Sequence, residues 1–161
     1  MPIPRKRVPS DKNLGKAAPG SRESRILRNK GGCTVKEYTG DKIRNVAIVG
    51  HGGAGTTSLT EALLYRSGAI SRMCKVEDGQ TTTDFEPEEI KRGVSVSATL
   101  APVEWRDVKI NFIDTPGFAD FVAEVKGAFR AVDSVLIVVS ATSGVQIGTE
   151  QCWKLAEEAG L

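Results

Sequence analysis

The sequence predicts an α/β domain with a mostly parallel sheet and helices on both faces. Two runs, residues 43–49 and 133–139, are apolar on both sides, as inner strands of a covered parallel sheet are. Segments with helical spacing of apolar residues occur at residues 57–67 and 149–159. A glycine-rich loop, residues 50–55, joins the first strand to its helix. This alternation of strand and helix is typical of an α/β sheet that is covered on both sides.

Residues 1–40 are predicted to form a disordered, basic extension in front of one domain at residues 41–161. Four of the seven prolines lie in the first twenty residues, and no periodic apolar pattern is present to offset the ordering entropy. Residues 1–42 carry 11 Lys or Arg against 4 Asp or Glu, whereas the rest carries 11 against 16. The extension has three interpretations: a solvating tail, a weak RNA contact, or a transit peptide, against which Asp11 and Glu23 argue.

The helix at residues 57–67 is expected to bury one face and to end at Gly68. Residues 69–92 are polar and lack periodicity, which indicates a functional or mobile loop. Two strands, at residues 94–105 and 108–113, are predicted around a tight turn at Arg106 and Asp107.

A further helix is predicted at residues 118–132, before the second inner strand. Its apolar residues share one stripe, as do those of the helix at residues 149–159, which is expected to end at Gly160. The predicted core residues of the two helices are Phe121, Val122, Val125, Ala128, Phe129 and Val132, and Cys152, Leu155, Ala156 and Ala159.

The loop after the first strand has the spacing of a phosphate-binding loop, Gly-x-x-x-x-Gly-Lys-Ser/Thr. Gly50, Gly55 and Thr57 fit this pattern, while Thr56 stands where the pattern has a lysine. Glycines let backbone N–H groups point at phosphate oxygens, and the following helix offers its positive end. The predicted nucleotide-binding residues of the loop are Gly50, His51, Gly52, Gly53, Ala54, Gly55, Thr56, Thr57 and Ser58.

A second candidate segment, Asp114, Thr115, Pro116 and Gly117, follows the strand at residues 108–113. An Asp at the carboxyl tip of a strand beside a phosphate loop is suited to hold the water shell of Mg²⁺. Gly117 allows a backbone N–H to approach a γ-phosphate. The alternative is that Asp114 caps the next helix and that Pro116 and Gly117 only turn the chain.

Composition argues against several classes of protein. Cys33, Cys74 and Cys152 are odd in number and have no metal-ligand spacing, which favours free thiols in a reducing compartment. No apolar run approaches the ~20 residues that cross a bilayer, and no secretory signal is recognisable. We therefore expect a cytoplasmic protein without a membrane partner.

These motifs, in this order, resemble the guanine-nucleotide domain of translational GTPases, most closely elongation factor G and its paralogues, over about residues 35–161. Residues 91–97 are similar to the switch I signature Arg-Gly-Ile-Thr, and residues 144–146 also resemble the family. Asp114 to Gly117 match the switch II signature. The resemblance implies a P-loop G domain that binds GTP or GDP, hydrolyses GTP and acts with the ribosome. It implies Mg²⁺ held by Thr57, by Ser95 and, through water, by Asp114.

Three features depart from the family pattern. Thr56 replaces the loop lysine, and the loss of a charged hydrogen bond worth ~1.5–3 kcal/mol predicts roughly ten- to a hundred-fold weaker binding. Phe118 stands at the position of the family's switch II histidine, so no intact catalytic residue is predicted, and His51 is interpreted as a loop residue. The family's Asn-Lys-x-Asp segment is absent because the chain ends first, at Leu161, which implies a domain truncated after its third helix. The strand at residues 134–139 would then be an apolar edge that recruits partners or aggregates.

Three functions stay open from the sequence. The first is a GTP-binding and GTP-hydrolysing domain. The second is a degenerate relative that contacts the ribosome or another protein without turnover, which Thr56 and Phe118 favour. The third is a P-loop ATPase or kinase, against which the two switch segments argue.

Overall fold

The structure, a computed structural model, describes residues 26–28 and 34–161. The chain divides into two units, residues 1–37 and residues 38–161. In the first unit, β1 (Ile26–Arg28) pairs antiparallel with β2 (Thr34–Lys36). Most of the predicted disordered extension lies outside the described residues. The candidate site lies in the second unit.

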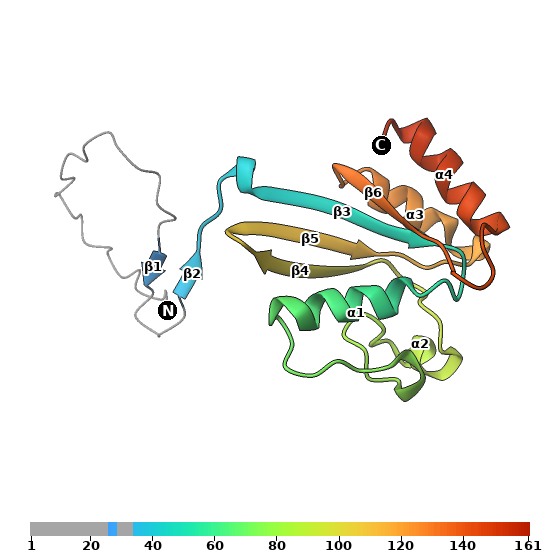
Figure 1. Ribbon diagram of the computed structural model, residues 1–161, viewed down its shortest axis with the longest axis horizontal. Helices are drawn as coiled ribbons and strands as arrows, with labels where there is room; N and C mark the ends of the chain where they lie inside the picture. The colour runs from blue at the N-terminus through green and yellow to red at the C-terminus, as the bar shows by residue number, and fades with distance from the viewer. Residues whose placement is uncertain (1–25, 29–33) are drawn as a thin grey trace, which may run out of the picture. The chain divides into compact units, whose positions relative to one another are not determined.

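The second unit contains a four-stranded mixed sheet (Figure 1). Its strands lie in the order β4 (Thr99–Trp105), β5 (Val108–Asp114), β3 (Ile43–Gly50) and β6 (Ser134–Val138). β3 runs parallel to β5 and β6, and only β4 is antiparallel to its neighbour. The mostly parallel sheet expected from the sequence is therefore confirmed. The hairpin between β4 and β5 turns at Arg106 and Asp107, whose φ angles are 47° and 63°.

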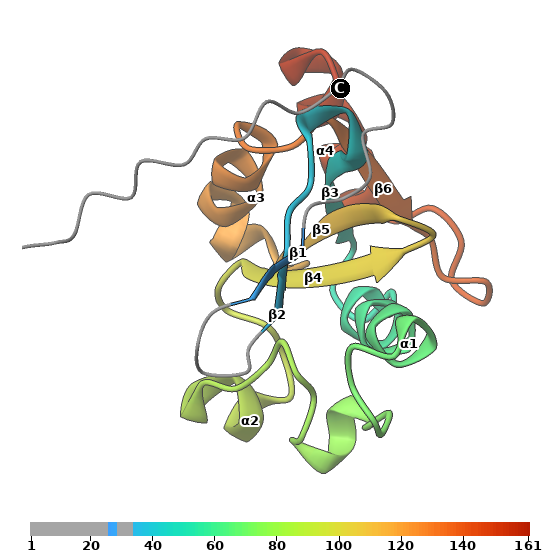
Figure 2. The same cartoon turned by 90° about the vertical axis from the view of Figure 1, so that its left-hand side faces the viewer.

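Helices cover both faces of this sheet (Figures 1 and 2). α1 (Thr56–Ser67) packs on one face, and α3 (Val122–Phe129) and α4 (Ile147–Ala159) pack on the other. The short α2 (Pro87–Arg92) lies in the connection between α1 and β4. Within the described residues, no helix has the length and apolar character needed to cross a membrane.

The central strand β3 joins two hydrophobic cores because successive side chains of a strand point to opposite faces. Ala47 and Val49 pack with α3 and α4, whereas Ile48 packs on the α1 side, and all three are fully buried. This two-sided burial explains why the run reads as continuously apolar. The other buried members of the two cores are Val125, Ala128, Phe129, Cys152 and Ala156 on one face, and Leu64, Ala101, Val103 and Phe112 on the other.

The strand predicted to begin at residue 94 begins instead at Thr99. The N–H groups of Val96 and Ser97 donate to Glu89 Oε1, at 2.9 and 3.2 Å, and Ala98 N donates to Glu124 Oε2 at 3.0 Å. Because these N–H groups bond to carboxylates, residues 94–98 do not join the ladder of the sheet. The boundary predicted from β-propensity was wrong for this reason.

The connection at residues 69–92 contains structure that the missing periodicity did not predict. It holds a 3₁₀ turn (Val76–Asp78) and α2. Glu86 and Glu89 form a capping box at the start of α2, with Pro87 as its first residue. Six residues are too few to show a hydrophobic period, so only the capping residues could have indicated this helix.

Two helix predictions also need correction. The predicted helix at residues 118–132 is a 3₁₀ turn (Ala119–Phe121) followed by α3, so Val132 lies outside the helix and Val122 is 37% exposed. α4 begins two residues earlier than expected, and Ala159 is exposed. The described residues thus contain four α-helices where the sequence predicted three. Gly68 and Gly160 end α1 and α4 in the left-handed conformation, as expected.

Candidate nucleotide site

Two segments from different parts of the chain meet at one edge of the sheet. β3 and β5 are parallel neighbours with Ile48 opposite Asp114, so their carboxyl ends lie side by side. The loop after Gly50 and the segment after Asp114 therefore leave the sheet at the same place. Open α/β sheets commonly bind ligands at this edge.

The loop between β3 and α1 depends on glycine. Gly53 and Gly55 have φ angles of 82° and 99°, which side chains rarely adopt. A β-carbon on Gly50 would lie 2.8 Å from the carbonyl oxygen of Val138 in the neighbouring strand. The loop can therefore turn sharply between β3 and the amino end of α1, whose first turn presents backbone N–H groups.

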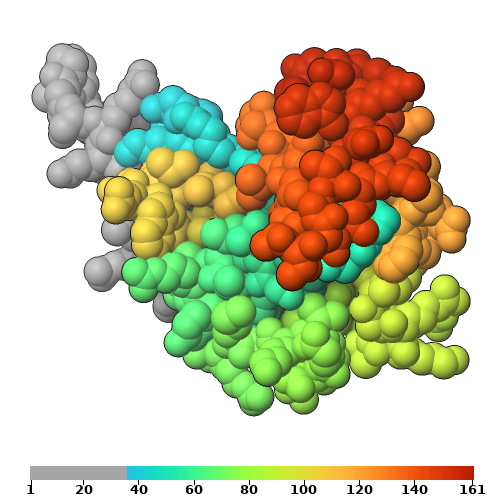
Figure 3. Space-filling view, turned by 45° about the vertical axis from the view of Figure 1, so that its right-hand side comes forward, coloured from blue at the N-terminus to red at the C-terminus, as the bar shows by residue number. Residues whose placement is uncertain are grey.

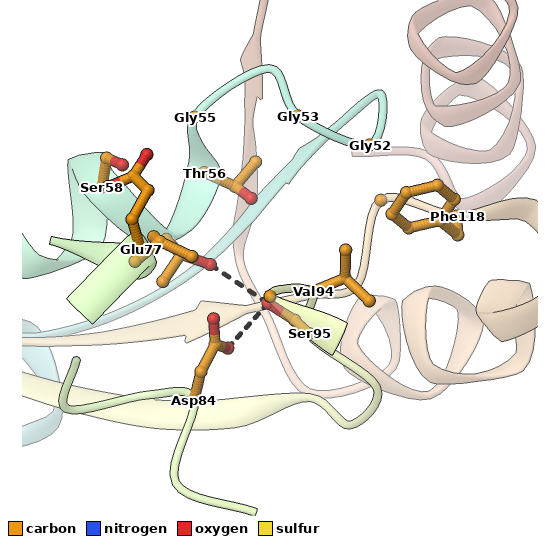
Figure 4. Close-up of a pocket in the computed structure, with 14 residues that line it drawn as sticks. Gly52, Gly53, Gly55, Thr56, Ser58, Glu77, Asp84, Val94, Ser95 and Phe118 are labelled. Atoms are coloured by element: carbon orange, nitrogen blue, oxygen red, sulfur yellow. Dashed lines mark hydrogen bonds between the residues drawn. The ribbon is translucent and has the colours of Figure 1, made fainter. Parts of the chain in front are cut away.

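A cavity of about 280 Å³ opens beside this loop (Figure 4). It is lined by the loop and the first turn of α1, by the connection before β4, and by the two residues at the end of the switch II segment. The lining residues are Gly52, Gly53, Gly55, Thr56, Thr57, Ser58, Val76, Glu77, Asp84, Gly93, Val94, Ser95, Gly117 and Phe118. None of these lining residues carries a positive charge. Thr56, at the lysine position of the motif, is 9% exposed and cannot replace the missing cation.

A cluster of hydroxyls and carboxylates adjoins this cavity, and three of its members, Thr57, Ser95 and Asp84, line it. Thr57 Oγ1 lies 3.1 Å from Ser95 Oγ, and Ser95 Oγ donates to Asp84 Oδ1 at 2.7 Å. Thr83 Oγ1 donates to Asp114 Oδ2 at 3.1 Å. Figure 4 shows Ser95 between Asp84 and the start of α1. The cluster thus joins α1, the connection before β4, and the end of β5.

The carboxylates of this cluster are poorly solvated. Burial raises the pKa of Asp114 to about 7, against hydrogen bonds from Thr57 and Thr83 that lower it, and the charge of Asp84 raises it further. Burial also raises the pKa of Asp84, which the Ser95 hydrogen bond opposes and the charge of Glu89 reinforces. Two carboxylates that repel each other and lack solvent would be stabilised by a bound cation.

The same cluster fits a magnesium ion by its chemistry. Asp84 Oδ2 and Asp114 Oδ1 are buried and have no hydrogen-bond partner among the described residues. Carboxylate and hydroxyl oxygens are the hard ligands that Mg²⁺ prefers. Thr57 and Ser95, which the resemblance implies as Mg²⁺ ligands, are brought together with Asp114, as that set requires. No group of three His, Cys, Asp or Glu side chains suited to a metal ion occurs in the described part of the chain.

Not every predicted site residue lines the cavity. Gly50, Ala54, Thr115 and Pro116 lie outside the lining. Thr115 is fully buried, and its hydroxyl donates to Ile48 O at 2.9 Å, which holds the switch II segment to β3. Asp114 also lies outside the lining, but one of its hydrogen-bond partners, Thr57, lines the cavity.

His51 does not line the cavity. Its Nδ1 accepts a hydrogen bond from Gly148 N at 3.3 Å, at the start of α4. A β-carbon on Gly148 would lie 2.6 Å from the same nitrogen, so the two residues are in close contact. The structure therefore places the only histidine of the chain between the loop and α4, as a residue that supports the loop.

The sequence did not single out three residues that line the cavity, Val76, Glu77 and Asp84, or Thr83, which bonds to Asp114. They lie in the polar connection before α2, and no fixed spacing relates them to the phosphate loop. The capping box at Glu86 was the only nearby signal. It indicates where α2 begins but not that the residues before it fold back onto α1.

The chain is similar in sequence and in fold to known proteins. Residues 41–161 match the family model described as the elongation factor Tu GTP binding domain. The chain is 42% identical over 116 residues to elongation factor G 2 of Borreliella burgdorferi, covering 72% of this chain and 17% of that protein. It is 41% identical over 123 residues to the mitochondrial ribosome-releasing factor 2 of Yarrowia lipolytica, covering 76% of this chain and 15% of that protein.

A solved structure is also similar to this chain in fold and in sequence. A crystal structure of a protein from Thermus thermophilus superposes with a TM-score of 0.73 at 49% identity, covering 76% of this chain and 18% of that chain. The chain thus spans about one sixth of the length of these relatives. On the family match, the sequence identities and the shared fold, the chain belongs to the elongation factor Tu GTP binding domain family.

Proposed function

We propose that residues 41–161 bind GTP and GDP as Mg²⁺ complexes, as the nucleotide-binding part of an elongation-factor-G-type translation factor that acts on the ribosome. The observation that carries this proposal is the meeting of the glycine loop with the Thr57, Ser95, Asp84 and Asp114 cluster beside one cavity. The loop N–H groups would bind the phosphates. The cluster would hold the cation, which when bound neutralises phosphate charge.

The same geometry supports weak rather than tight binding. The charged residues that line the cavity, Glu77 and Asp84, are both acidic, so an anionic phosphate meets no attractive side-chain charge. We therefore propose that affinity depends strongly on Mg²⁺, and that Asp84 joins the residues around the cation. Cytoplasmic location and contact of the basic extension with RNA are parts of the same proposal.

A second candidate function has one observation in its favour. Phe118, which lines the cavity and is 46% exposed, offers no hydrogen-bonding atom to a water molecule. A domain that binds nucleotide but hydrolyses it slowly, and that acts as a binding module at the ribosome or on another protein, is consistent with this side chain.

Titration of a fluorescent GDP analogue, with and without Mg²⁺, tests the proposed function. We expect weak binding in EDTA that Mg²⁺ strengthens. GDP should displace the analogue more strongly than ADP does. Asp84→Asn should raise the Mg²⁺ concentration needed for half-maximal binding. Asp78→Asn, an exposed change six residues earlier, serves as its control. Binding that is equal in EDTA and in Mg²⁺, or equal competition by ADP, would contradict the proposal.

A further inference from the structure

Two buried glutamates lie next to the nucleotide site without lining its cavity. Glu61 on α1 and Glu89 on α2 are each 1% exposed. A buried carboxylate is costly unless hydrogen bonds replace its lost hydration. In both residues, backbone N–H groups of the connection between α1 and β4 supply these bonds.

Glu61 anchors the first part of this connection. Its Oε1 accepts Cys74 N at 3.2 Å, and its Oε2 accepts Thr82 N at 2.9 Å. The carboxylate of Glu61 therefore binds the backbone at Cys74 and at Thr82, which are eight residues apart in the chain. Thr82 lies two residues before Asp84.

Glu89 anchors the last part of the connection. Its Oε1 accepts Val96 N at 2.9 Å and Ser97 N at 3.2 Å, while its Oε2 accepts Glu86 N at 3.1 Å. The first of these contacts is adjacent in the chain to Ser95. Glu61 and Glu89 thus each bind a backbone N–H group within two residues of a side chain in the hydroxyl and carboxylate cluster, Asp84 for Glu61 and Ser95 for Glu89.

The hydrogen bonds to Glu61 and Glu89 flank the residues that face Thr57. Thr57 lies one helical turn before Glu61 on α1, so the helix that presents the cluster's hydroxyl also carries the first anchor. Asp84 and Ser95 lie between the anchored points and bond to each other and to Thr57 Oγ1. A carboxylate suits this task because each oxygen accepts N–H donors, whereas an amide would present its own NH₂ group to one of them.

We propose that Glu61 and Glu89 are positioning residues that hold residues 74–97 against α1, so that Asp84 and Ser95 face Thr57 before nucleotide arrives. The expected effect of the two glutamates on Mg²⁺ binding rests on the proposed function. The ordering of residues 74–97 does not depend on that function, because the hydrogen bonds to Glu61 and Glu89 lie within the protein.

Hydrogen exchange on the nucleotide-free chain tests the ordering directly. In Glu61→Gln we expect amides at residues 74–84 to exchange about ten-fold faster, and in Glu89→Gln those at residues 95–97, since one charged hydrogen bond corresponds to at least that factor. Amides of β3 and β5 should exchange as in the wild type. Glu88→Gln is the matched control, because Glu88 is exposed and pairs with Arg92 on the same helix.

Binding of a fluorescent GDP analogue then separates positioning from general stability. We expect Glu61→Gln to require about ten-fold more Mg²⁺ for half-maximal binding, with the weak affinity in EDTA unchanged. A merely structural role would weaken binding in both conditions. Wild-type exchange rates in both variants, or faster exchange throughout the sheet, would overturn the proposal. If the wild-type chain binds no nucleotide, the proposed function fails, and the exchange data alone decide on the two anchors.

Discussion

The Phe118 ring packs directly on Gly52, a residue of the phosphate loop. A β-carbon on Gly52 would lie 2.9 Å from two ring carbons of Phe118, and one on Gly117 would lie 2.7 Å from Gly52 N. Residues 117 and 118 and the phosphate loop are therefore in contact with each other where both line the cavity. In Figure 4 the ring borders the side of the loop that carries Gly52 and Gly53.

This contact leads to a prediction about turnover. Phe118→His places a group that can bind and orient water where a ring now offers none, so GTP hydrolysis should rise by about 10²-fold or more. GDP affinity should change little, because the ring makes no polar contact. Phosphate release in single turnover measures the effect, and Phe118→Leu is the control. Equal rates in the two variants would show that this position does not limit hydrolysis.

The lining without positive charge leads to a second prediction. Thr56→Lys should strengthen binding of GDP and GTP by roughly ten- to a hundred-fold, because it adds one charged hydrogen bond to the phosphates. Ser71→Lys is the matched control, since it adds the same charge at an exposed position that does not line the cavity. Titration of a fluorescent GDP analogue measures both. If the two lysines raise the affinity for the analogue equally, the increase would come from net charge and not from the motif position.

The raised pKa of Asp114 predicts how stability depends on pH. A carboxyl whose pKa is about 7 in the folded chain and about 3.8 in the unfolded chain binds more protons when folded, so the free energy of unfolding falls as pH rises between these values. The effect amounts to roughly 4 kcal/mol at most. Asp114→Asn should be more stable than the wild type at pH 8, with a gap that narrows toward pH 5.

Urea unfolding in EDTA at several pH values measures this difference, and Asp120→Asn, at an exposed position, serves as its control. Added Mg²⁺ should stabilise the wild type more at pH 8 than at pH 5, because the cation competes with the proton for the same carboxylate. A gap between Asp114→Asn and the wild type that is constant with pH would contradict this account.

We expect the chain to self-associate through the edge strand β6. Leu136 on β6 is 40% exposed, and β6 pairs on one side only with β3 in the described sheet. The surface of β6, the following loop and α4 (orange to red in Figure 3) also exposes Val139, Val145, Ile147 and Trp153. Exposed apolar edges pair with other strands. Sedimentation velocity should therefore show species larger than the monomer.

Leu136→Lys should shift this chain toward the monomer without changing its fold. Leu100→Lys on β4, the opposite edge, is the control, because Pro102 already interrupts the donors of that strand. A wild-type chain that is monodisperse and monomeric would disprove the prediction.

The sequence predicted the site unevenly, for reasons visible in particular residues. Gly50, Gly55 and Thr57 lie within one local turn, so their spacing alone indicates the phosphate loop. The function of Ser95 was inferred only by resemblance, and its distance to Thr57 confirms that the two hydroxyls meet. Asp84 was missed because it reaches the site through the path of a polar connection, which has no periodic signal.

What the sequence determined by itself is the set of local structures: the doubly apolar strand at residues 43–49, the glycine loop, the turn at Arg106 and Asp107, and the glycines that end α1 and α4. These depend on backbone conformation and on hydrogen bonds between residues close in the chain. Only the tertiary structure decided which distant groups meet. Residues 94–98 stay out of the sheet because the carboxylates of Glu89 and Glu124 accept hydrogen bonds from the N–H groups of residues 96–98. Asp84 is linked to Thr57 through Ser95, whose hydroxyl contacts both side chains. Such contacts form between residues far apart in the chain, so no local pattern predicts them.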